Sequence, residues 1–507
     1  MKKKPMNVVF IMTDTQAKHM VGCYGDKNVD TPHLDAFAET GIRFENAYTV
    51  APICTPARGA IFSGQAPQVN GAWTNNVSPH GAIPLMGTIF NYYGFMAAYT
   101  GKWHLDGTGY FGDGQPGGGF LSDWWYDGKN YADDLGPERF QEYREVHSVE
   151  AARKAGFTEE ECWGYRVASK AIEFLDEVDQ NDPFVLAVSF DEPHHPSVAP
   201  PEYWEQFEGE DKIIKRANYY QELAENKPRM QHVQRSQQSP TERYLSPLDG
   251  LYGCNAFIDR QIGRVIDKVT ERHGDNTMII YTSDHGDMLG SHGLWYKGPQ
   301  MYQECVNVPF IVRMPGGAKG AVSTSVVSHL DLIPTMLDLA GIDIPASLHG
   351  VSILPLLEDP NAKVRDFAMT NFHRFSINFD LFGSFYPIRC ATGERYKLVI
   401  NLLDTDEFYD LEQDPYEVTN LIDSPEHAQI RDHMHDWILE EMDRIRDPYR
   451  TFHWSKRSWR DVGDMFYMKQ PFAFSNLPDG FPFQHECIHA DGSYTNKGND
   501  PFSELKM

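Results

Sequence analysis

The stretch NVVFIMTD, residues 7–14, decides the fold class of this chain of 507 residues. It is a short, nearly continuous apolar run that ends in a carboxylate, which is typical of a strand buried on both faces of a sheet. The same pattern returns in FVLAVSF (184–190), TMIIYTS (277–283) and VPFIVRMPG (308–316). We therefore expect these runs to be strands of one buried sheet.

Helix-like segments alternate with the predicted strands. Residues 31–41 open on Thr31-Pro32, a helix start signal, and residues 250–272 carry apolar side chains at helical spacing. This alternation predicts an α/β fold in which a large mixed, mostly parallel sheet is sandwiched by helices. In such sheets, binding and catalytic residues gather at the carboxyl ends of the strands.

The pattern changes near residue 365. The runs DFAMTNF, RCATGERYKLVINL and EFYDL predict a small antiparallel sheet, and a helical segment follows them. We predict a catalytic α/β domain over residues 1–365 and an α+β subdomain over residues 366–450. Residues 451–507 are too aromatic for a disordered tail, so we expect this extension to wrap over the main body.

The charge balance bears on the class of partner. The chain has 45 Lys and Arg residues against 72 Asp and Glu residues, a formal net charge of −27, and no basic stripe. This composition argues against nucleic acid as a partner. No stretch has the roughly 20 apolar residues that a membrane span requires, so we expect no membrane partner either. An anionic substrate would need positive charge gathered locally.

The cysteines and the first residues bear on the compartment. The seven cysteines are an odd number, widely spread and without a CxxC pair, which argues against a disulfide framework and fits a reducing compartment. The start MKKKPMNVVFIMTD is similar to a signal peptide, but its apolar run is short and meets an acidic residue at once. We therefore expect a cytoplasmic protein.

Two predicted strands end in carboxylates. Residues 7–13 lead into Asp14, and residues 277–283 lead into Asp284 and His285. A single carboxylate in such a place is more often a cap or turn residue. Two carboxylates at one sheet edge, however, suit calcium or magnesium, and the adjacent imidazole also admits manganese or zinc.

Other strand ends carry bases. The strand at 184–190 runs into DEPHHP, in which prolines bracket His194 and His195. Fixed backbone suits a positioned acid or base, although paired surface histidines are the alternative. Lys102 and His104 end a further short strand, where extended backbone would direct both side chains to one face.

One cysteine has unusual neighbours. Cys54 lies in ICTPARGAIFSG, residues 53–64, close to Pro56 and Arg58. A structural cysteine needs no such neighbours. Lys297, in WYKG, is an ordinary surface lysine unless a nearby group needs a cation. The local positive charge that an oxyanion would require is available from Arg58, Lys102, His104, His194 and Lys297.

Together these motifs resemble the type I sulfatases of the alkaline-phosphatase superfamily, and bacterial sulfatases without a signal peptide most of all. The stretch Cys54-Thr55-Pro56-Ala57-Arg58 is similar to the C-x-P-x-R signature that a maturation enzyme reads when it oxidises the cysteine to formylglycine. NVVFIMTD, the GKWHL and SDHG boxes, SHLDLIPTMLDLAGI and FYDLEQDPYEVTNL stand in the family's order. The resemblance implies an alkaline-phosphatase-like fold.

The resemblance implies a sulfuric ester hydrolase, of which arylsulfatases are examples. Cys54 would become formylglycine, and the hydrate of its aldehyde would supply the oxygen that attacks sulfur. Asp14, Asp284 and His285, with the modified Cys54, would hold one divalent cation, which is calcium in most relatives. A formylglycine-generating enzyme would be a partner during maturation.

The resemblance also implies roles for the cationic groups. Arg58 would orient the formylglycine, and Lys102 and Lys297 would bind the sulfate. His104 and His194 match the family's two histidines. We expect His194, aided by Lys297, to protonate the leaving alcohol and His104 to take the second diol proton, although these two roles could be exchanged.

The chain departs from the family pattern at two places. Many relatives have a second aspartate after the first, whereas Thr15 and Gln16 follow Asp14 here, so either is a candidate metal ligand or a neighbour of the ligands. The Thr-Gly that usually follows the signature is Ser63-Gly64, which keeps the hydroxyl.

Recognition of the rest of the substrate falls to loops. Polar and aromatic residues in these loops favour a sulfated carbohydrate over a plain aryl sulfate, although paired tryptophans are at least as often packing residues. The candidates are Trp73, Asn75, Asn76, Trp124, Trp125, His195, His373 and Arg374.

Three other functions fit parts of the pattern. A phosphonate monoester or phosphodiester hydrolase could use the same formylglycine on phosphorus. A two-metal phosphodiesterase could place a second ion on Asp191 and His195, but Lys102 and Lys297 oppose it because they would stand where that ion binds. An unmodified, non-catalytic protein could keep the pocket for anion binding.

Overall fold

The computed structural model divides the chain into two compact units, Met1–Arg450 and Thr451–Met507. It describes residues 6–25, 30–209, 212–213, 215–237, 248–377 and 385–460, and the backbone of β13 (Glu486–Ile488) and β14 (Tyr494–Asn496). Most of the predicted extension 451–507 lies outside the described residues. Its wrapping over the main body and the domain boundary near residue 365 therefore stay predictions.

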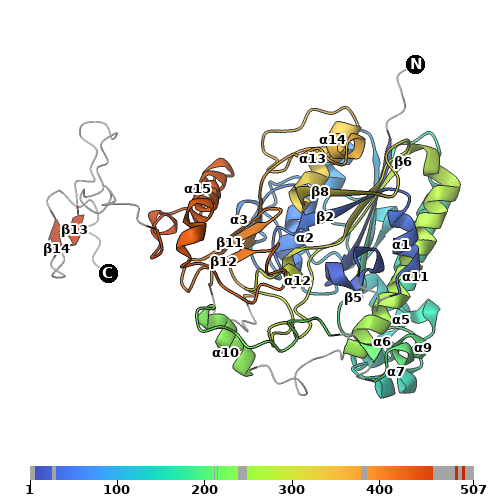
Figure 1. The fold of residues 1–507 in the computed structure, drawn as a ribbon. Helices are drawn as coiled ribbons and strands as arrows, with labels where there is room; N and C mark the ends of the chain where they lie inside the picture. The colour runs from blue at the N-terminus through green and yellow to red at the C-terminus, as the bar shows by residue number, and fades with distance from the viewer. Residues whose placement is uncertain are drawn as a thin grey trace. The chain divides into compact units, whose positions relative to one another are not determined.

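An eight-stranded mixed sheet forms the centre of the first unit (Figure 1). Its strand order is β4-β3-β5-β1-β6-β7-β2-β8. Neighbouring strands are parallel except where β7 pairs with β6 and β2. The strands are β1 (Asn7–Asp14), β2 (Ile42–Tyr48), β3 (Met96–Gly101), β4 (Trp125–Tyr126), β5 (Phe184–Pro193), β6 (Thr277–Ser283), β7 (Phe310–Arg313) and β8 (Ala321–Ser328). The predicted α/β class with a mixed, mostly parallel sheet is confirmed.

The side chains of β1 alternate between two hydrophobic cores. Val9 and Ile11 pack into the core that contains α1 (Pro32–Ala38), α8 (Trp163–Glu177) and α11 (Leu248–His273). Val8, Phe10 and Met12 enter the opposite core, with α2 (Cys54–Ser63), α4 (Met86–Tyr92) and α13 (Leu332–Leu339). Because both faces are covered, these strands are continuous apolar runs, as the sequence predicted.

The remaining helices surround this sheet or precede the second sheet of the unit. They are α3 (Pro67–Asn70), α5 (Gly128–Leu135), α6 (Pro137–Arg144), α7 (Val149–Ala155), α9 (Pro201–Gln206), α10 (Arg229–Gln237), α12 (Gln303–Val306) and α14 (Leu354–Glu358). The predicted helices at 31–41 and 250–272 correspond to α1 and α11.

A four-stranded antiparallel sheet follows, as the sequence predicted. Its order is β12-β11-β10-β9, and its core continues against the segment around α12. The strands are β9 (Ala368–Phe372), β10 (Ile388–Thr392), β11 (Tyr396–Asn401) and β12 (Glu407–Asp410), and α15 (Ala428–Arg444) follows them. This sheet brings the segment after β9 to residues 73–76, because the backbone of Asn75 bridges to Ser376.

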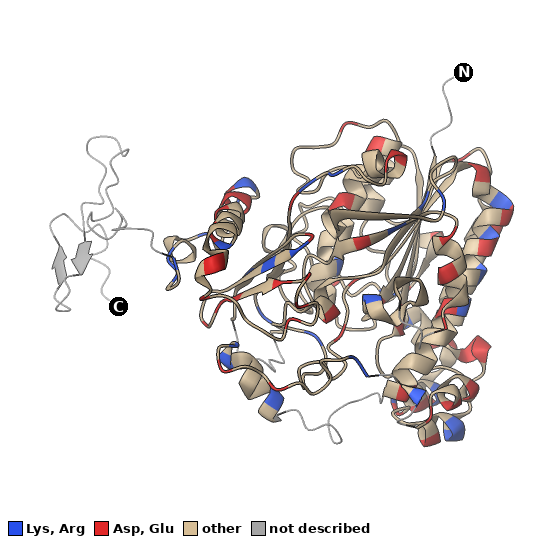
Figure 2. Ribbon diagram, in the orientation of Figure 1, with Lys and Arg blue, Asp and Glu red and all other residues tan. Residues whose placement is uncertain are grey.

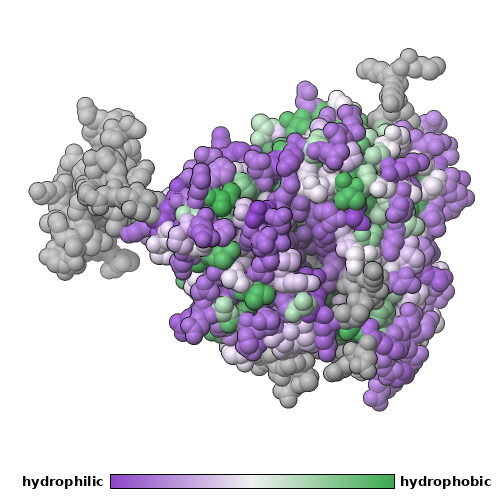
Figure 3. All heavy atoms as spheres, in the orientation of Figure 1, coloured by the Kyte–Doolittle hydropathy of each residue, from purple (hydrophilic) through white to green (hydrophobic). Residues whose placement is uncertain are grey.

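Figure 2 shows that acidic and basic residues alternate along helices such as α11 and α15. The face of the protein drawn in Figure 3 is mostly hydrophilic. The hydrophobic side chains on the face drawn in Figure 3 form small separate patches. Among the described residues, no helix combines the length and the apolar character needed to cross a bilayer. The described cysteines are all free thiols.

Gly101→Ala is expected to destabilise the protein by about 3 kcal/mol. The backbone of Gly101 has φ +111°, and an added Cβ would lie 1.8 Å from the carbonyl oxygen of Ser189 on β5. Neither backbone can retreat without breaking the pairing of β3 with β5. Urea unfolding measures the loss, and Gly81→Ala is the control because nothing lies within 4 Å of its added Cβ. Equal stability of both variants would contradict this account.

Candidate active site

Three central strands bring acidic residues to one edge of the sheet. β1 lies between β5 and β6 and runs parallel to both. Asp14 ends β1, Asp191 lies near the end of β5, and Asp284 directly follows β6. All three carboxylates are buried. The carboxyl edge of the sheet is therefore the place where charge is concentrated, as expected for this class of fold.

Helix α2 presents Cys54 and Arg58 to this edge. Both residues lie on this helix, which begins at Cys54. Residues four apart on a helix share a face, so both side chains point to the same place. The Arg58 guanidinium lies 2.9 Å from Asp14 Oδ2 and 2.9 Å from Asp284 Oδ2.

Arg58 makes two further hydrogen bonds, one to backbone and one to a side chain. Its Nη1 donates to the Lys102 carbonyl oxygen at 2.6 Å and to Ser189 Oγ at 2.8 Å. Burial opposes the charge, but Asp284 and Asp14 raise the pKa of Arg58 above its ordinary value. The guanidinium is thus a permanent cation that joins the ends of β1, β3, β5 and β6.

Four side chains form a cluster with the composition of a metal site. Potential ligand atoms of Asp14, Cys54, Asp284 and His285 all lie within 4.8 Å of one another. His285 Nε2 is 3.2 Å from Cys54 Sγ, 3.9 Å from Asp14 Oδ1 and 3.7 Å from Asp284 Oδ1. Ligands about 2.3–2.6 Å from one ion are separated by roughly this much. The cluster therefore fits one divalent cation.

The two carboxylates of the cluster differ in their electrostatic surroundings. Burial opposes ionisation of Asp14, but the Lys102 ammonium holds the pKa of its carboxyl well below the usual range. Burial and the neighbouring Asp14 carboxylate raise the pKa of Asp284 to about 7. In each case Oδ2 faces Arg58, and Oδ1 faces His285. The Oδ1 atoms are therefore the ones available to a cation.

Of the two residues after Asp14, Thr15 lies at the cluster and Gln16 does not. The Thr15 hydroxyl donates to Asp14 Oδ1 at 2.8 Å. The Gln16 amide instead donates to Asn255 Oδ1 at 2.6 Å and accepts from the Tyr281 hydroxyl. Because these partners hold the amide between β6 and α11, the structure favours Thr15 as the neighbour of a metal ion.

Both lysines singled out from the sequence are buried beside this cluster. Lys102 Nζ lies 2.8 Å from Asp14 Oδ2 and 3.0 Å from Asp191 Oδ1. Lys297 is 4% exposed, and its Nζ donates to Thr15 Oγ1 at 3.0 Å. The surface alternative for Lys297 is therefore wrong. Lys102 also occupies the Asp191 carboxylate on which a second metal ion would depend.

His104 does not lie on extended backbone, contrary to the sequence expectation. Its φ is +57°, in the left-handed region, so the chain turns sharply just after β3. Nε2 lies 2.9 Å from Asn76 Oδ1, and Nδ1 is buried without a hydrogen-bond partner among the described residues. Burial and Lys102 hold the pKa of His104 well below its ordinary value, so the ring is neutral.

His194 is buried at the site and His195 stacks on it. Nε2 of His194 lies 3.9 Å from Asp14 Oδ1, and Nδ1 lies 2.8 Å from the His195 carbonyl oxygen. The two imidazole rings stack with centroids 4.0 Å apart. Burial and the cation of Lys297 hold the pKa of His194 well below its ordinary value. A free surface position for His194 is therefore excluded.

The segment 73–76 links the site to the second sheet. Asn75 Oδ1 accepts from the Thr55 backbone at 3.0 Å, directly beside Cys54, and Asn76 contacts His104 as described above. The Trp73 ring meets the buried His373 ring at 6.4 Å. Arg374 donates to the Ile377 carbonyl oxygen at 3.3 Å. The structure thus groups most of the predicted recognition residues.

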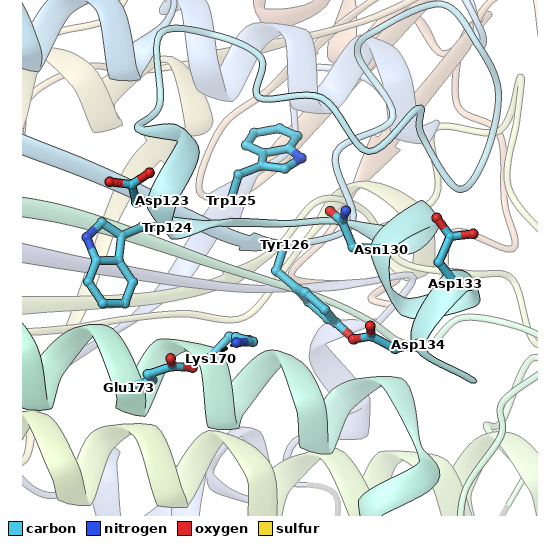
Figure 4. A pocket seen from close by; sticks show the side chains of 9 residues that line it. All are labelled: Asp123, Trp124, Trp125, Tyr126, Asn130, Asp133, Asp134, Lys170 and Glu173. Atoms are coloured by element: carbon cyan, nitrogen blue, oxygen red, sulfur yellow. Dashed lines mark hydrogen bonds and ion pairs between the residues drawn. The ribbon is translucent and has the colours of Figure 1, made fainter. Parts of the chain in front are cut away.

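Trp124 and Trp125 lie elsewhere. Trp125 stacks on Tyr99 at 5.0 Å inside the core, and Trp124 packs against Phe174 of α8 at 5.2 Å. Figure 4 shows the two indole rings on opposite sides of the backbone, and both are among the residues that line a pocket together with Lys170 and Glu173. These contacts favour the packing alternative for both tryptophans.

The sequence did not identify Tyr110, and it considered Asp191 only as a ligand of a second metal ion. The Tyr110 hydroxyl donates to Asp191 Oδ1 and lies 2.7 Å from His194 Nδ1. Tyr110 belongs to a glycine-rich loop, whose course cannot be read from periodicity. The only available signal was a tyrosine six residues after His104.

Comparisons with known proteins agree with these features. The sulfatase family model matches residues 6–342, and the model described as N-sulphoglucosamine sulphohydrolase, C-terminal, matches residues 290–444. The uncharacterized sulfatase YidJ of Escherichia coli (strain K12) is 43% identical over 475 residues, which cover 90% of this chain and 91% of that protein.

Two solved structures are similar in fold. One is a protein in complex with its substrate D-glucosamine-2-N,6-O-disulfate, with a TM-score of 0.69, 23% identity, and coverage of 88% of this chain and 99% of that one. The other is a phosphonate monoester hydrolase of Agrobacterium radiobacter, with a TM-score of 0.72, 22% identity, and coverage of 87% and 96%. The sulfatase family model matches well over half of this chain, and the similarity to YidJ covers 90% of it. The chain therefore belongs to the sulfatase family.

Proposed function

We propose that this protein hydrolyses sulfate monoesters of a carbohydrate through an oxygen nucleophile formed at position 54. The observation that carries the proposal is the position of Cys54, whose thiol lies 3.2 Å from His285 and 3.7 Å from Asp14 within the cluster of potential metal ligands. Arg58, Lys102 and Lys297 surround the same point with positive charge. That arrangement suits an oxyanion, which a protein of net charge −27 would otherwise repel.

Two groups complete this site in the proposal. A divalent cation held by Asp14, Asp284, His285 and residue 54 would act as a Lewis acid toward the nucleophile and the sulfuryl oxygens. The carboxylate oxygens favour Ca²⁺, with Mg²⁺ or Mn²⁺ as alternatives. Formylglycine derived from Cys54, introduced by a maturation enzyme, would provide a hydrated aldehyde as the nucleophile.

The chain's own residues would then handle charge and protons. Arg58, Lys102 and Lys297 stabilise the negative charge that spreads over the sulfuryl oxygens in the transition state. Asp284 accepts the proton that the attacking hydroxyl loses. His194 Nε2 gives a proton to the leaving alcohol oxygen, and an anionic substrate beside the ring favours the protonated form that this step needs.

His104 fits the complementary role of base. Its Nε2 lies 2.9 Å from Asn76 Oδ1. Because an amide oxygen only accepts, Nε2 carries the hydrogen and Nδ1 holds a free lone pair. A neutral ring with a free lone pair can take the second proton from the nucleophilic residue, which releases sulfate and restores the starting group.

A sulfated carbohydrate is the substrate class that the neighbouring loops support. Trp73, Asn75 and Asn76 lie on the segment that contacts the backbone beside Cys54, and His373 meets the Trp73 ring, so together they offer the mixture of aromatic and amide groups that suits a sugar. A structural neighbour binds a sulfated glucosamine, which agrees with this choice. The free thiols of the described cysteines support action in the cytoplasm.

Turnover of a substrate panel tests the proposal. Sulfated mono- and disaccharides, aryl sulfates and phosphonate monoesters are offered to the matured enzyme, and released sulfate or phosphonate is measured. We expect the highest kcat/KM on a sulfated sugar. Preference for a phosphonate monoester would instead show that the protein is a phosphonate monoester hydrolase. The similarity in fold to such an enzyme is the reason for including this substrate.

Elemental analysis is expected to find one divalent ion per chain bound at the cluster. Asp284→Asn should lose that ion, because it removes a charged ligand from the cluster of Asp14, Cys54, Asp284 and His285. Asp127→Asn is the matched control, since it alters the other group of potential ligands in the described residues, Asp106, Asp113 and Asp127. Two ions, both lost in Asp284→Asn, would contradict the one-metal scheme and favour a two-metal phosphodiesterase.

Mass spectrometry of the peptide that contains residue 54 tests the modification. Protein purified from its native host is expected to show the loss of mass that accompanies conversion of the thiol to the aldehyde. An intact thiol in every molecule would contradict the proposed catalysis and support a non-catalytic anion-binding protein.

A further inference from the structure

We propose that Tyr110 is a positioning residue that holds His194 in the orientation needed to protonate the leaving alcohol. This inference rests on the proposed function of His194. Tyr110 lies in the loop between β3 and β4, away from the recognised sequence motifs. Its hydroxyl nevertheless contacts two buried groups of the site at once, the His194 ring and the Asp191 carboxylate.

The direction of each hydrogen bond follows from the acceptors. Nδ1 of His194 lies 2.8 Å from the His195 carbonyl oxygen, and a carbonyl oxygen only accepts, so Nδ1 carries a hydrogen. The Tyr110 hydroxyl, 2.7 Å from the same nitrogen, must then accept there and donate its own hydrogen to Asp191 Oδ1. The three groups form a chain that ends on a carboxylate.

This chain fixes which nitrogen faces the reaction. With Nδ1 tied to Tyr110 and His195, the other nitrogen, Nε2, points toward Asp14 at 3.9 Å and thus toward the Cys54 cluster. A base or acid that is oriented by a third group is the arrangement that proton transfer in enzymes repeatedly uses. Asp191 is itself held by Lys102 Nζ at 3.0 Å, so the chain is anchored at both ends.

The ring and the hydroxyl of Tyr110 have separate tasks. Lys102 Nζ lies 3.8 Å from the centre of the ring, so the aromatic face covers the cation that binds the sulfate. The hydroxyl makes the hydrogen bond to His194, whereas the ring meets the His194 ring with centroids 5.2 Å apart. Tyr110→Phe therefore keeps the cover over Lys102 and the ring contact with His194, and it removes only the two hydrogen bonds of the hydroxyl, to His194 and Asp191.

We expect Tyr110→Phe to make kcat depend more strongly on the pKa of the leaving phenol. A phenol of low pKa leaves without a proton, whereas a poor leaving group needs His194. For Tyr110→Phe we expect kcat on 4-nitrophenyl sulfate within about 3-fold of the wild type and kcat on 4-methoxyphenyl sulfate about 10- to 100-fold lower. Tyr131→Phe is the matched control, because the buried Tyr131 hydroxyl donates to the Glu161 carbonyl oxygen at 2.8 Å instead.

Melting temperatures of both variants are measured alongside the kinetics. Equal losses on all aryl sulfates, or no loss on any, would overturn the role of Tyr110.

A crystal structure of Tyr110→Phe gives an independent readout, in which we expect the His194 ring to rotate or to split between orientations. An unchanged ring would count against the proposal. If the wild type hydrolyses aryl phosphonates and no sulfate, the proposed function fails, and the same comparison on aryl phosphonates still decides the role of Tyr110.

Discussion

Cys54→Ala is expected to lower sulfate ester hydrolysis by about 10⁴-fold or more without unfolding the protein. The side chain at position 54 is the one on which the cationic groups and the metal-type cluster converge. Alanine leaves no atom that can attack sulfur, so the surrounding residues retain only substrate binding and charge stabilisation. Sulfate release measured at saturating substrate tests the expectation.

The fold should survive this substitution because Cys54 contributes only a small side chain at the start of α2. The matched control is Cys254→Ala, which removes an equally buried thiol that contacts the Val198 carbonyl oxygen. We expect the control to keep its activity. Hydrolysis retained in Cys54→Ala would refute the nucleophile, and unfolding of Cys54→Ala alone would show that the thiol is structural.

Arg58→Met is expected to destabilise the metal-free protein by about 3–5 kcal/mol. The guanidinium lies 2.9 Å from carboxylate oxygens of both Asp14 and Asp284, and all three side chains are fully buried. Methionine fills much of the volume but leaves these carboxylates facing each other without that cation. Urea unfolding in the presence of a chelator measures the loss, and activity should fall as well.

The same variant offers a specific test of the metal-type cluster. Added Ca²⁺ should recover part of the lost stability, because a divalent ion also neutralises Asp14 and Asp284. Arg153→Met is the control, since its ion pairs with Glu205 and Glu208 are exposed and should contribute little. A loss in Arg58→Met no larger than in this control would contradict the electrostatic account.

Local patterns predicted the strands well and their ends less well. The run at 277–283 coincides with β6, whereas β5 continues to Pro193 because Asp14 of β1 pairs with Pro193. Of the predicted strand 308–316, only Phe310–Arg313 forms β7, because only these residues pair with β6 and β2. Strand cores are determined by hydrophobic burial, but strand ends depend on neighbouring strands that local sequence does not reveal.

At the candidate site, too, local sequence could predict some residues and not others. Asp14, Asp284 and His285 could be predicted because each follows a strand directly, and parallel neighbours end at one edge. Tyr110 could not, because its place depends on a loop path. Nor could the choice of Thr15 over Gln16, which rests on Asn255 and Tyr281 holding the amide.

By itself, the sequence determined the α/β class, the C-x-P-x-R signature around Cys54 and the types of residue available for chemistry. All of these depend on the spacing and polarity of residues over short stretches. Only the tertiary structure decided which of them meet. Lys297 and Thr15, which lie 282 residues apart, come within 3.0 Å, while Trp124 and Trp125 turn to packing. The reason is that side-chain direction depends on the register of β1, β5 and β6 and on the helices packed against them, which are long-range contacts.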